Sequence, residues 1–248
     1  MTNLTLRTPA TGPIAVALTA PGIQLTVEAV AGITEATLHL SGPAETIQQA
    51  TATRIETAWV ITVPAPAPTV ISAGGVTHIS GNVVGSVFMS GNQTVINGVT
   101  FNNGTVTGAT EPVTGLLRVP VESLLGTRID NGSVETRGAL SGVHHHGRNS
   151  SLSVAVVGDL VSDGTNGPVS IGRAHGEIDV HTTNGTVTVG QAGPLTKVRS
   201  TNGNVLVHAG CPGRINARTT NGDVAIHKSG YRVDATTSTT NGRDRVYA

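Results

Sequence analysis

The sequence predicts an all-β protein whose larger part is a β-solenoid with coils of about 18 residues. Three observations predict this fold. A dipeptide recurs at a nearly fixed period, β-branched residues alternate at a fixed phase to that dipeptide, and aromatic side chains are scarce.

The repeated dipeptide is Asn-Gly, which recurs at nearly equal spacings that lengthen slightly toward the end of the chain. Asn-Gly can close a type I′ hairpin or form the corner of a coil. We favour the coil, because a hairpin meander does not need the same residues at the same phase in every copy. Coils stacked about 4.8 Å apart place corner asparagines above one another, where their side chains can form a hydrogen-bonded ladder. The expected ladder residues are Asn166, Asn184, Asn202, Asn221 and Asn241.

A strand with one buried face is predicted to follow each corner, because the third and fifth residues after the asparagine are β-branched. A second short strand leads into the next Thr/Ser-rich corner. Two columns of the thin core are therefore expected to be Val169, Val187, Val205 and Val224, and Ile171, Val189, Val207 and Ile226.

The composition agrees with a narrow core. Only 2% of the 248 residues are aromatic and 12% are charged, whereas glycine occurs 32 times. The formal net charge is zero, so no general electrostatic field favours a polyanion, and we expect no nucleic-acid partner. The single cysteine excludes an intrachain disulfide and a cysteine-based metal site.

The chain divides into four predicted parts. Residues 1–63 read as a β-rich segment or cap, residues 64–69 as a Pro/Ala linker, residues 70–111 as a Gly/Val-rich β-coil insertion, and residues 112–248 as the solenoid. Whether residues 1–63 form an independent domain is left open. Residues 44–57 suit either a short helix or a strand, and Asp244 and its charged neighbours are expected to break the last coil as an end cap.

No secretory signal and no apolar run of about 18 residues is visible, so we expect no membrane partner. The expected location is the cytoplasm or a virus particle.

Histidines give the metal candidates. On a strand, His144 and His146 would share one face, although a polar loop is the simpler interpretation of this run. His208 and His227 occupy the same phase in adjacent coils and would lie about 5 Å apart. His181, Arg199 and Arg218 form another column, which could meet an acidic glycan or the carboxylates of a partner, although a solvated face is the simpler interpretation. We expect neither a metal nor a cofactor.

Carboxylates at Asp159, Asp163, Glu177 and Asp179 form the acidic grouping of the solenoid, at differing phases. Paired acids on a coil face can perform acid–base chemistry on a polysaccharide. No nucleophile triad or phosphate loop accompanies them, so an enzyme is not expected.

The stretches TNGPVSI, TNGTVTV, TNGNVLV and TNGDVAI resemble an actinobacterial family of β-strand-repeat proteins labelled putative adhesins. The resemblance covers residues 127–248 well and residues 1–63 loosely. It implies a stacked β-solenoid without catalytic residues.

The expected function is therefore structural or adhesive: a neutral rod that presents a repetitive surface to a protein, a glycan or copies of itself, for example as a fibre, spike or decoration protein of a virion. Phe88, Met89 and Phe101 are the candidate contact residues, with a local core plug as the other interpretation. The alternative function is a protein that binds or degrades polysaccharide.

Overall fold

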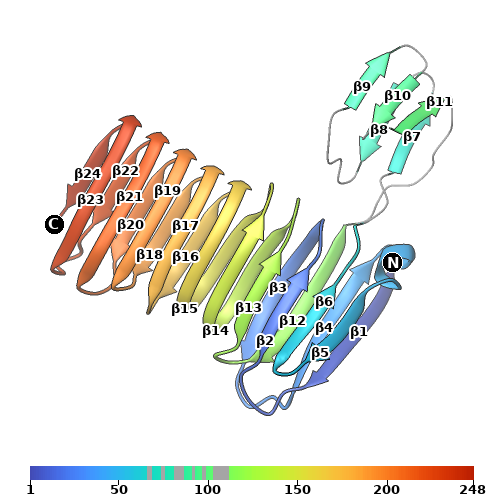
Figure 1. Cartoon of the computed structure of the whole chain (residues 1–248), viewed down its shortest axis with the longest axis horizontal. Helices are drawn as coiled ribbons and strands as arrows, with labels where there is room; N and C mark the ends of the chain where they lie inside the picture. Colours follow the sequence, from blue (N-terminus) through green and yellow to red (C-terminus); the bar gives the residue numbers. More distant parts are fainter. Residues whose placement is uncertain (66–68, 74–75, 81–86, 91–92, 97–98, 103–111) are drawn as a thin grey trace.

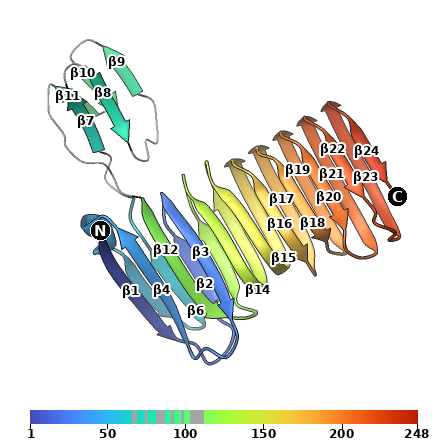
Figure 2. The same cartoon turned by 180° about the vertical axis from the view of Figure 1, so that it is seen from behind.

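The computed structural model describes residues 1–65, 69–73, 76–80, 87–90, 93–96, 99–102 and 112–248. It is nearly all β, with 70% strand and 2% helix, and its coils form a solenoid of about seven turns at a spacing of about 19 residues. Successive coils lie side by side along the long axis of the molecule (Figures 1 and 2). The predicted fold class is confirmed.

Two ladders of strands face each other across the core. β14 (Ser133–Gly147) and β15 (Ser151–Asn166) are long strands that bend and contribute to both ladders. From the N-terminal end, the other strands of the first ladder are β1 (Thr2–Pro9), β4 (Glu35–Gly42), β12 (Val113–Pro120), β3 (Ile23–Val30), β16 (Val169–Ala174), β18 (Val187–Ala192), β20 (Val205–Ala209), β22 (Val224–His227) and β24 (Asp244–Tyr247).

The second ladder begins with an antiparallel pair and continues with parallel strands. Its strands besides β14 and β15 are β5 (Thr51–Ile55), β6 (Ala58–Thr62), β2 (Ala15–Thr19), β13 (Leu124–Arg128), β17 (Glu177–Asn184), β19 (Leu195–Asn202), β21 (Gly213–Asn221) and β23 (Val233–Asn241).

Shorter elements complete the described chain. Helix α1 (Ala44–Ile47) precedes β5, so residues 44–57 contain both a helix and a strand. Two antiparallel groups lie in the insertion: β7 (Thr69–Ala73) with β8 (Val76–Ser80), and β10 (Gln93–Ile96) between β9 (Val87–Ser90) and β11 (Val99–Asn102).

Parallel pairing settles the role of the Asn-Gly corners. Asn184 of β17 pairs with Asn166 of β15 on one side and with Asn202 of β19 on the other. A hairpin would have paired each strand antiparallel with the next, so the corners connect the two ladders of one coil.

The core contains the expected β-branched columns. Val187, Val189, Val205 and Val207 are each at most 1% exposed, and side chains from both ladders pack between them. A corner residue larger than glycine would hold the coils apart, because a Cβ on Gly203 would lie 2.2 Å from the Gly185 carbonyl oxygen.

Two expectations are wrong. His144, His145 and His146 lie within strand β14, not in a loop, because the backbone pairs with β13 and β15 on both sides. Asp244 does not break the last coil, since β24 is a regular strand in register with β22.

Candidate functional site

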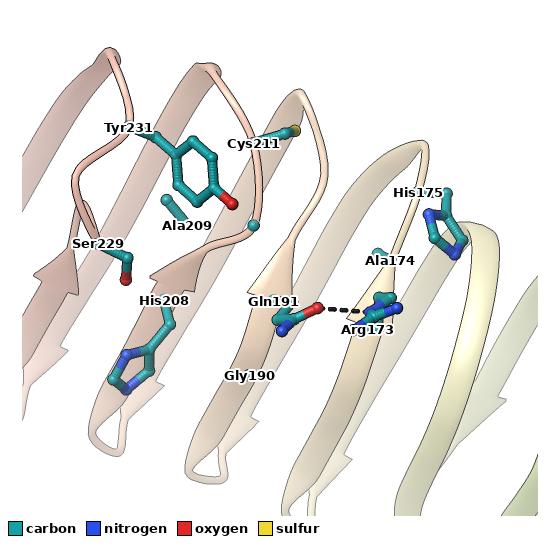
Figure 3. Close-up of a pocket in the computed structure, with 11 residues that line it drawn as sticks. Arg173, Ala174, His175, Gly190, Gln191, His208, Ala209, Cys211, Ser229 and Tyr231 are labelled. Carbon is teal, nitrogen blue, oxygen red and sulfur yellow. Dashed lines mark hydrogen bonds between the residues drawn. The ribbon is translucent and has the colours of Figure 1, made fainter.

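An open hollow of about 580 Å³ lies where four successive coils leave the first ladder (Figure 3). The ends of β16, β18 and β20 provide one side, and the corners that follow provide the other. It is lined by Arg173, Ala174, His175, Gly190, Gln191, His208, Ala209, Gly210, Cys211, Ser229 and Tyr231.

The hollow forms because the corners that border it contain more residues in the later coils. The separation between successive corner asparagines is longer after Asn202 than before it, and the additional residues fall at the corners after β20 and β22. Ser229 and Gly230 have φ values of 52° and 78°, and the Tyr231 N–H donates to the Lys228 carbonyl at 2.9 Å. This turn holds Ser229 and Tyr231 at the rim, where the tyrosine is 43% exposed.

Arg173 is the fixed cation of the hollow. Its Nε donates a hydrogen bond to Oε1 of Gln191 in the next coil (Figure 3). Gln191 is neutral, so the contact orients the guanidinium without compensating its charge. Among the described residues that line the hollow, none is Asp or Glu.

His208 begins a stack of rings beside the hollow. The centroids of His208 and His227 are 4.4 Å apart at an interplanar angle of 9°, and His227 stacks on Tyr247 at 4.4 Å. Burial, and next the charge of His227, hold the pKa of His208 below its ordinary value. The in-plane lone pairs of parallel rings run side by side and do not converge on one ion, so the geometry favours stacking over chelation.

The outer face of the second ladder carries the candidate histidines His144, His146 and His181. Asp163 lies between His146, whose Nδ1 is 3.8 Å from Oδ2, and His181, whose Nδ1 is 3.5 Å from Oδ1. His144 and His146 line a second hollow of about 380 Å³ with Arg128 and Val161. Within the residues that the structure describes, no three His, Cys, Asp or Glu side chains are grouped closely enough to hold a metal ion.

His145 points the opposite way, into the core. It is 4% exposed, its Nδ1 lies 2.9 Å from the Thr127 hydroxyl, and its Nε2 lies 3.0 Å from the Ser150 hydroxyl. Burial, with a smaller effect of His146, lowers its pKa to about 4.

The four candidate carboxylates belong to β15 and β17, and none of them lines the hollow of Arg173. Asp159 accepts a hydrogen bond from the Glu177 N–H at 2.7 Å, and Asp179 pairs in register with Lys197. The corner asparagines form a continuous series of Nδ2-to-Oδ1 hydrogen bonds of 2.5 to 2.7 Å, through Asn131, Asn149, Asn166, Asn184, Asn202, Asn221 and Asn241.

Phe88 and Met89 belong to β9 and Phe101 to β11. Their side chains lie outside the described part of the structure.

Sequence reasoning missed the hollow of Arg173, although a signal was present. Insertions in a repeat array gather on one face, which is often the binding face, so the longer spacings after Asn202 marked these corners. Interpreted only as variation in the period, they predicted no site.

No helix of the described residues is long and apolar enough to cross a membrane.

Comparisons by sequence find no match, neither to a protein-family model nor to a curated protein. The fold is similar to that of solved bacterial structures. A putative adhesin from Bacteroides fragilis NCTC 9343 aligns with a TM-score of 0.52 and 10% identity, over 99% of this chain and 94% of that chain.

Two further structures from Parabacteroides align at a TM-score of 0.45. A putative adhesin from P. merdae ATCC 43184 is 11% identical over 99% of this chain and 95% of its own. A putative lipid binding protein from P. distasonis ATCC 8503 is 10% identical over 98% of this chain and 96% of its own. The actinobacterial origin of the resemblance is not supported, whereas the likeness to structures described as putative adhesins is.

Proposed function

We propose that this protein is a non-enzymatic recognition solenoid that binds polysaccharide at the hollow of Arg173. The observation that carries the proposal is the lining of the hollow. It combines an exposed tyrosine ring with a guanidinium, an amide, two imidazoles and a hydroxyl group. Such a mixture suits a sugar, which presents an apolar ring face and many hydroxyl groups.

The location of the carboxylates supports binding over catalysis. Glycoside cleavage ordinarily needs two carboxyl groups about 5 to 10 Å apart on either side of the scissile bond. The residues that line the hollow include no carboxylate, and Asp159, Asp163, Glu177 and Asp179 all belong to the second ladder.

The fold supplies rigidity, which lowers the entropic cost of binding. Arg173 pairs in register with Gln191, and His208 pairs in register with His227, on parallel strands. The name of the Bacteroides fragilis structure, a putative adhesin, agrees with a recognition role.

Affinity electrophoresis of the intact protein through native gels tests the proposal. Each gel would contain one polysaccharide: amylose, mannan, xylan, pectate, alginate or hyaluronan. We expect at least one to retard the protein and Tyr231→Ala to abolish the retardation, while Arg7→Ala on β1, at the far end of the same ladder, leaves it intact. Absence of retardation in every gel, or equal retardation of the Tyr231 variant, overturns the proposal. New reducing ends in the gel would indicate an enzyme instead.

Self-association is a second candidate, which one observation favours. Ile55, Leu124 and Val161 are 58%, 39% and 47% exposed on the outer face of the second ladder. Small residues lie between them in register, among them Ala15, Ala17, Ala58 and Gly126.

A second copy of the chain could cover this apolar face, as in a fibre, spike or decoration protein of a virion. Light scattering across a concentration series tests this candidate. A fixed oligomer that Val161→Lys dissociates supports it, and a monomer of 25.1 kDa at every concentration rejects it.

A further inference from the structure

We propose that the hollow of Arg173 selects a carboxylated sugar, a uronic-acid unit of a polysaccharide, and that Arg173 binds its carboxylate. This inference rests on the proposed function, because it names the ligand class of the same site.

The side chain of Arg173 still has hydrogen-bond donors available for an anion. Gln191 accepts from Nε, which leaves both terminal amino groups without a partner among the described residues. Two parallel N–H groups of a guanidinium match the two oxygens of a carboxylate. Because Gln191 also fixes the orientation of the group, less side-chain entropy is lost when the anion binds.

The charge around Arg173 is favourable for an anion. No salt bridge involves Arg173 among the described residues, and none of the lining residues is acidic. Asp159, at the adjacent corner, accepts from the Glu177 N–H and is not part of the lining. An anion in the hollow therefore meets the positive charge of Arg173, which no salt bridge among the described residues neutralises.

The remaining lining residues suit a sugar more than a bare anion. Ser229 can hydrogen-bond to a ring hydroxyl, and the exposed Tyr231 ring can pack on the apolar face of a pyranose. His208 remains mostly neutral at pH 7 because burial lowers its pKa. One ring nitrogen can then donate to a hydroxyl group, and the other can accept from one.

The dimensions favour a polymer. The lining residues come from four successive coils, which at a strand spacing of about 4.8 Å extend over about 14 Å. The lining residues follow one another from coil to coil (Figure 3), and the hollow opens to solvent. An open trough of this kind binds several units of a chain and does not enclose a free metabolite.

Isothermal titration calorimetry of the full chain tests the inference. The ligands would be pentamers of galacturonate, mannuronate and guluronate and a hyaluronan hexasaccharide, each paired with its methyl ester, which keeps the shape but removes the charge. A sulfated galactose oligomer and inorganic sulfate serve as competing anions. The variant is Arg173→Gln, and the matched control is Arg7→Gln, which removes an exposed arginine from β1 at the N-terminal end of the same ladder.

At least one free acid should bind about tenfold more tightly than its ester, and Arg173→Gln should remove that difference while Arg7→Gln keeps it. If an ester binds as well as its acid, or Arg173→Gln has no effect, the inference is wrong but polysaccharide recognition stands. Equal or tighter binding of the sulfated oligomer overturns the choice of carboxylate, and inorganic sulfate alone would show a simple anion site. If no oligosaccharide binds, both proposals fail.

Discussion

At the scale of single residues, His145 is the titratable group of the described chain whose pKa the fold shifts most. It is buried between hydroxyl groups of Thr127 and Ser150, and no carboxylate contacts it among the described residues. Two hydroxyl partners can satisfy a neutral imidazole, which donates from one nitrogen and accepts at the other. Protonation would place an unpaired charge in the core.

We therefore expect the stability of the protein to fall below neutral pH. The pKa of His145 is lowered from 6.5 to about 4 in the folded chain, so its contribution is complete above pH 6.5 and is lost as the pH falls toward 4. The free energy of unfolding should decrease by about 2 kcal/mol between pH 7.5 and pH 5, as measured by urea denaturation.

The His145→Gln variant isolates this effect from other titrating groups, since glutamine can keep both hydroxyl contacts without titrating. It should lose most of the pH dependence, and His144→Gln, on the exposed neighbouring position, should retain it. A variant at His145 with the same pH profile as the original chain would contradict the assignment.

The neighbours of His145 show how far sequence reasoning extends at this scale. Strand alternation correctly predicted that His144 and His146 share a face. The burial of His145 was missed, because a histidine on a core column looks polar in a hydrophobicity pattern. Its partner Thr127 lies 18 residues earlier, one coil away, so the period itself pointed to the contact.

At the scale of elements, the asparagine ladder links the coils at one corner. Asn184 donates to Asn166 and accepts from Asn202, each at 2.7 Å, whereas Asn241 only donates, to Asn221. We expect Asn184→Ala to lower the free energy of unfolding by about 1 to 2 kcal/mol, because two hydrogen bonds are lost.

Asn241→Ala is the matched control, and its effect should be about half as large, since one bond is lost. Urea denaturation of both variants measures the difference. Equal effects, or no effect of Asn184→Ala, would mean that the asparagine ladder is a consequence of coil stacking and does not stabilise the fold.

The strands and their pairing could be predicted because each coil repeats the same local pattern at the same phase. Residues Thr182, Ser200 and Thr219 show what the pattern left out. They recur at one phase, as the Thr/Ser-rich corners predict. Ser200 and Thr219 donate to the backbone carbonyls of Gly185 and Gly203 in the preceding coil. The partner of a hydroxyl depends on a rotamer, which the repeat does not encode.

At the scale of the whole molecule, the N-terminal strands continue the solenoid. β3 lies between β12 and β14, and β2 lies between β6 and β13, although none of these partners is a neighbour in the sequence. The sequence predicted that residues 1–63 are rich in strands but not which strands they pair with. Residues 1–63 have no Asn-Gly phase, so nothing local determined where they pair.

The last pair of strands carries polar residues at core positions. Asp244 is in register with the buried Val224, and Thr237 is in register with the buried Ala217. The Thr237 hydroxyl donates to Oδ2 of Asp244 at 3.1 Å, so the two polar groups satisfy each other between the ladders. Within the described chain, β24 has a strand neighbour on one side, β22.

An inward carboxylate at an open edge opposes the stacking of another coil, because stacking would bury the charge. We therefore expect Asp244→Val to cause end-to-end association, which light scattering would detect as a mass that rises with concentration. Arg245→Val, on the outer face of the same strand, adds the same apolar side chain outside the core column and should leave the mass unchanged. If both variants associate equally, added surface hydrophobicity explains the association. Asp244 is then not the residue that prevents another coil from stacking on β24.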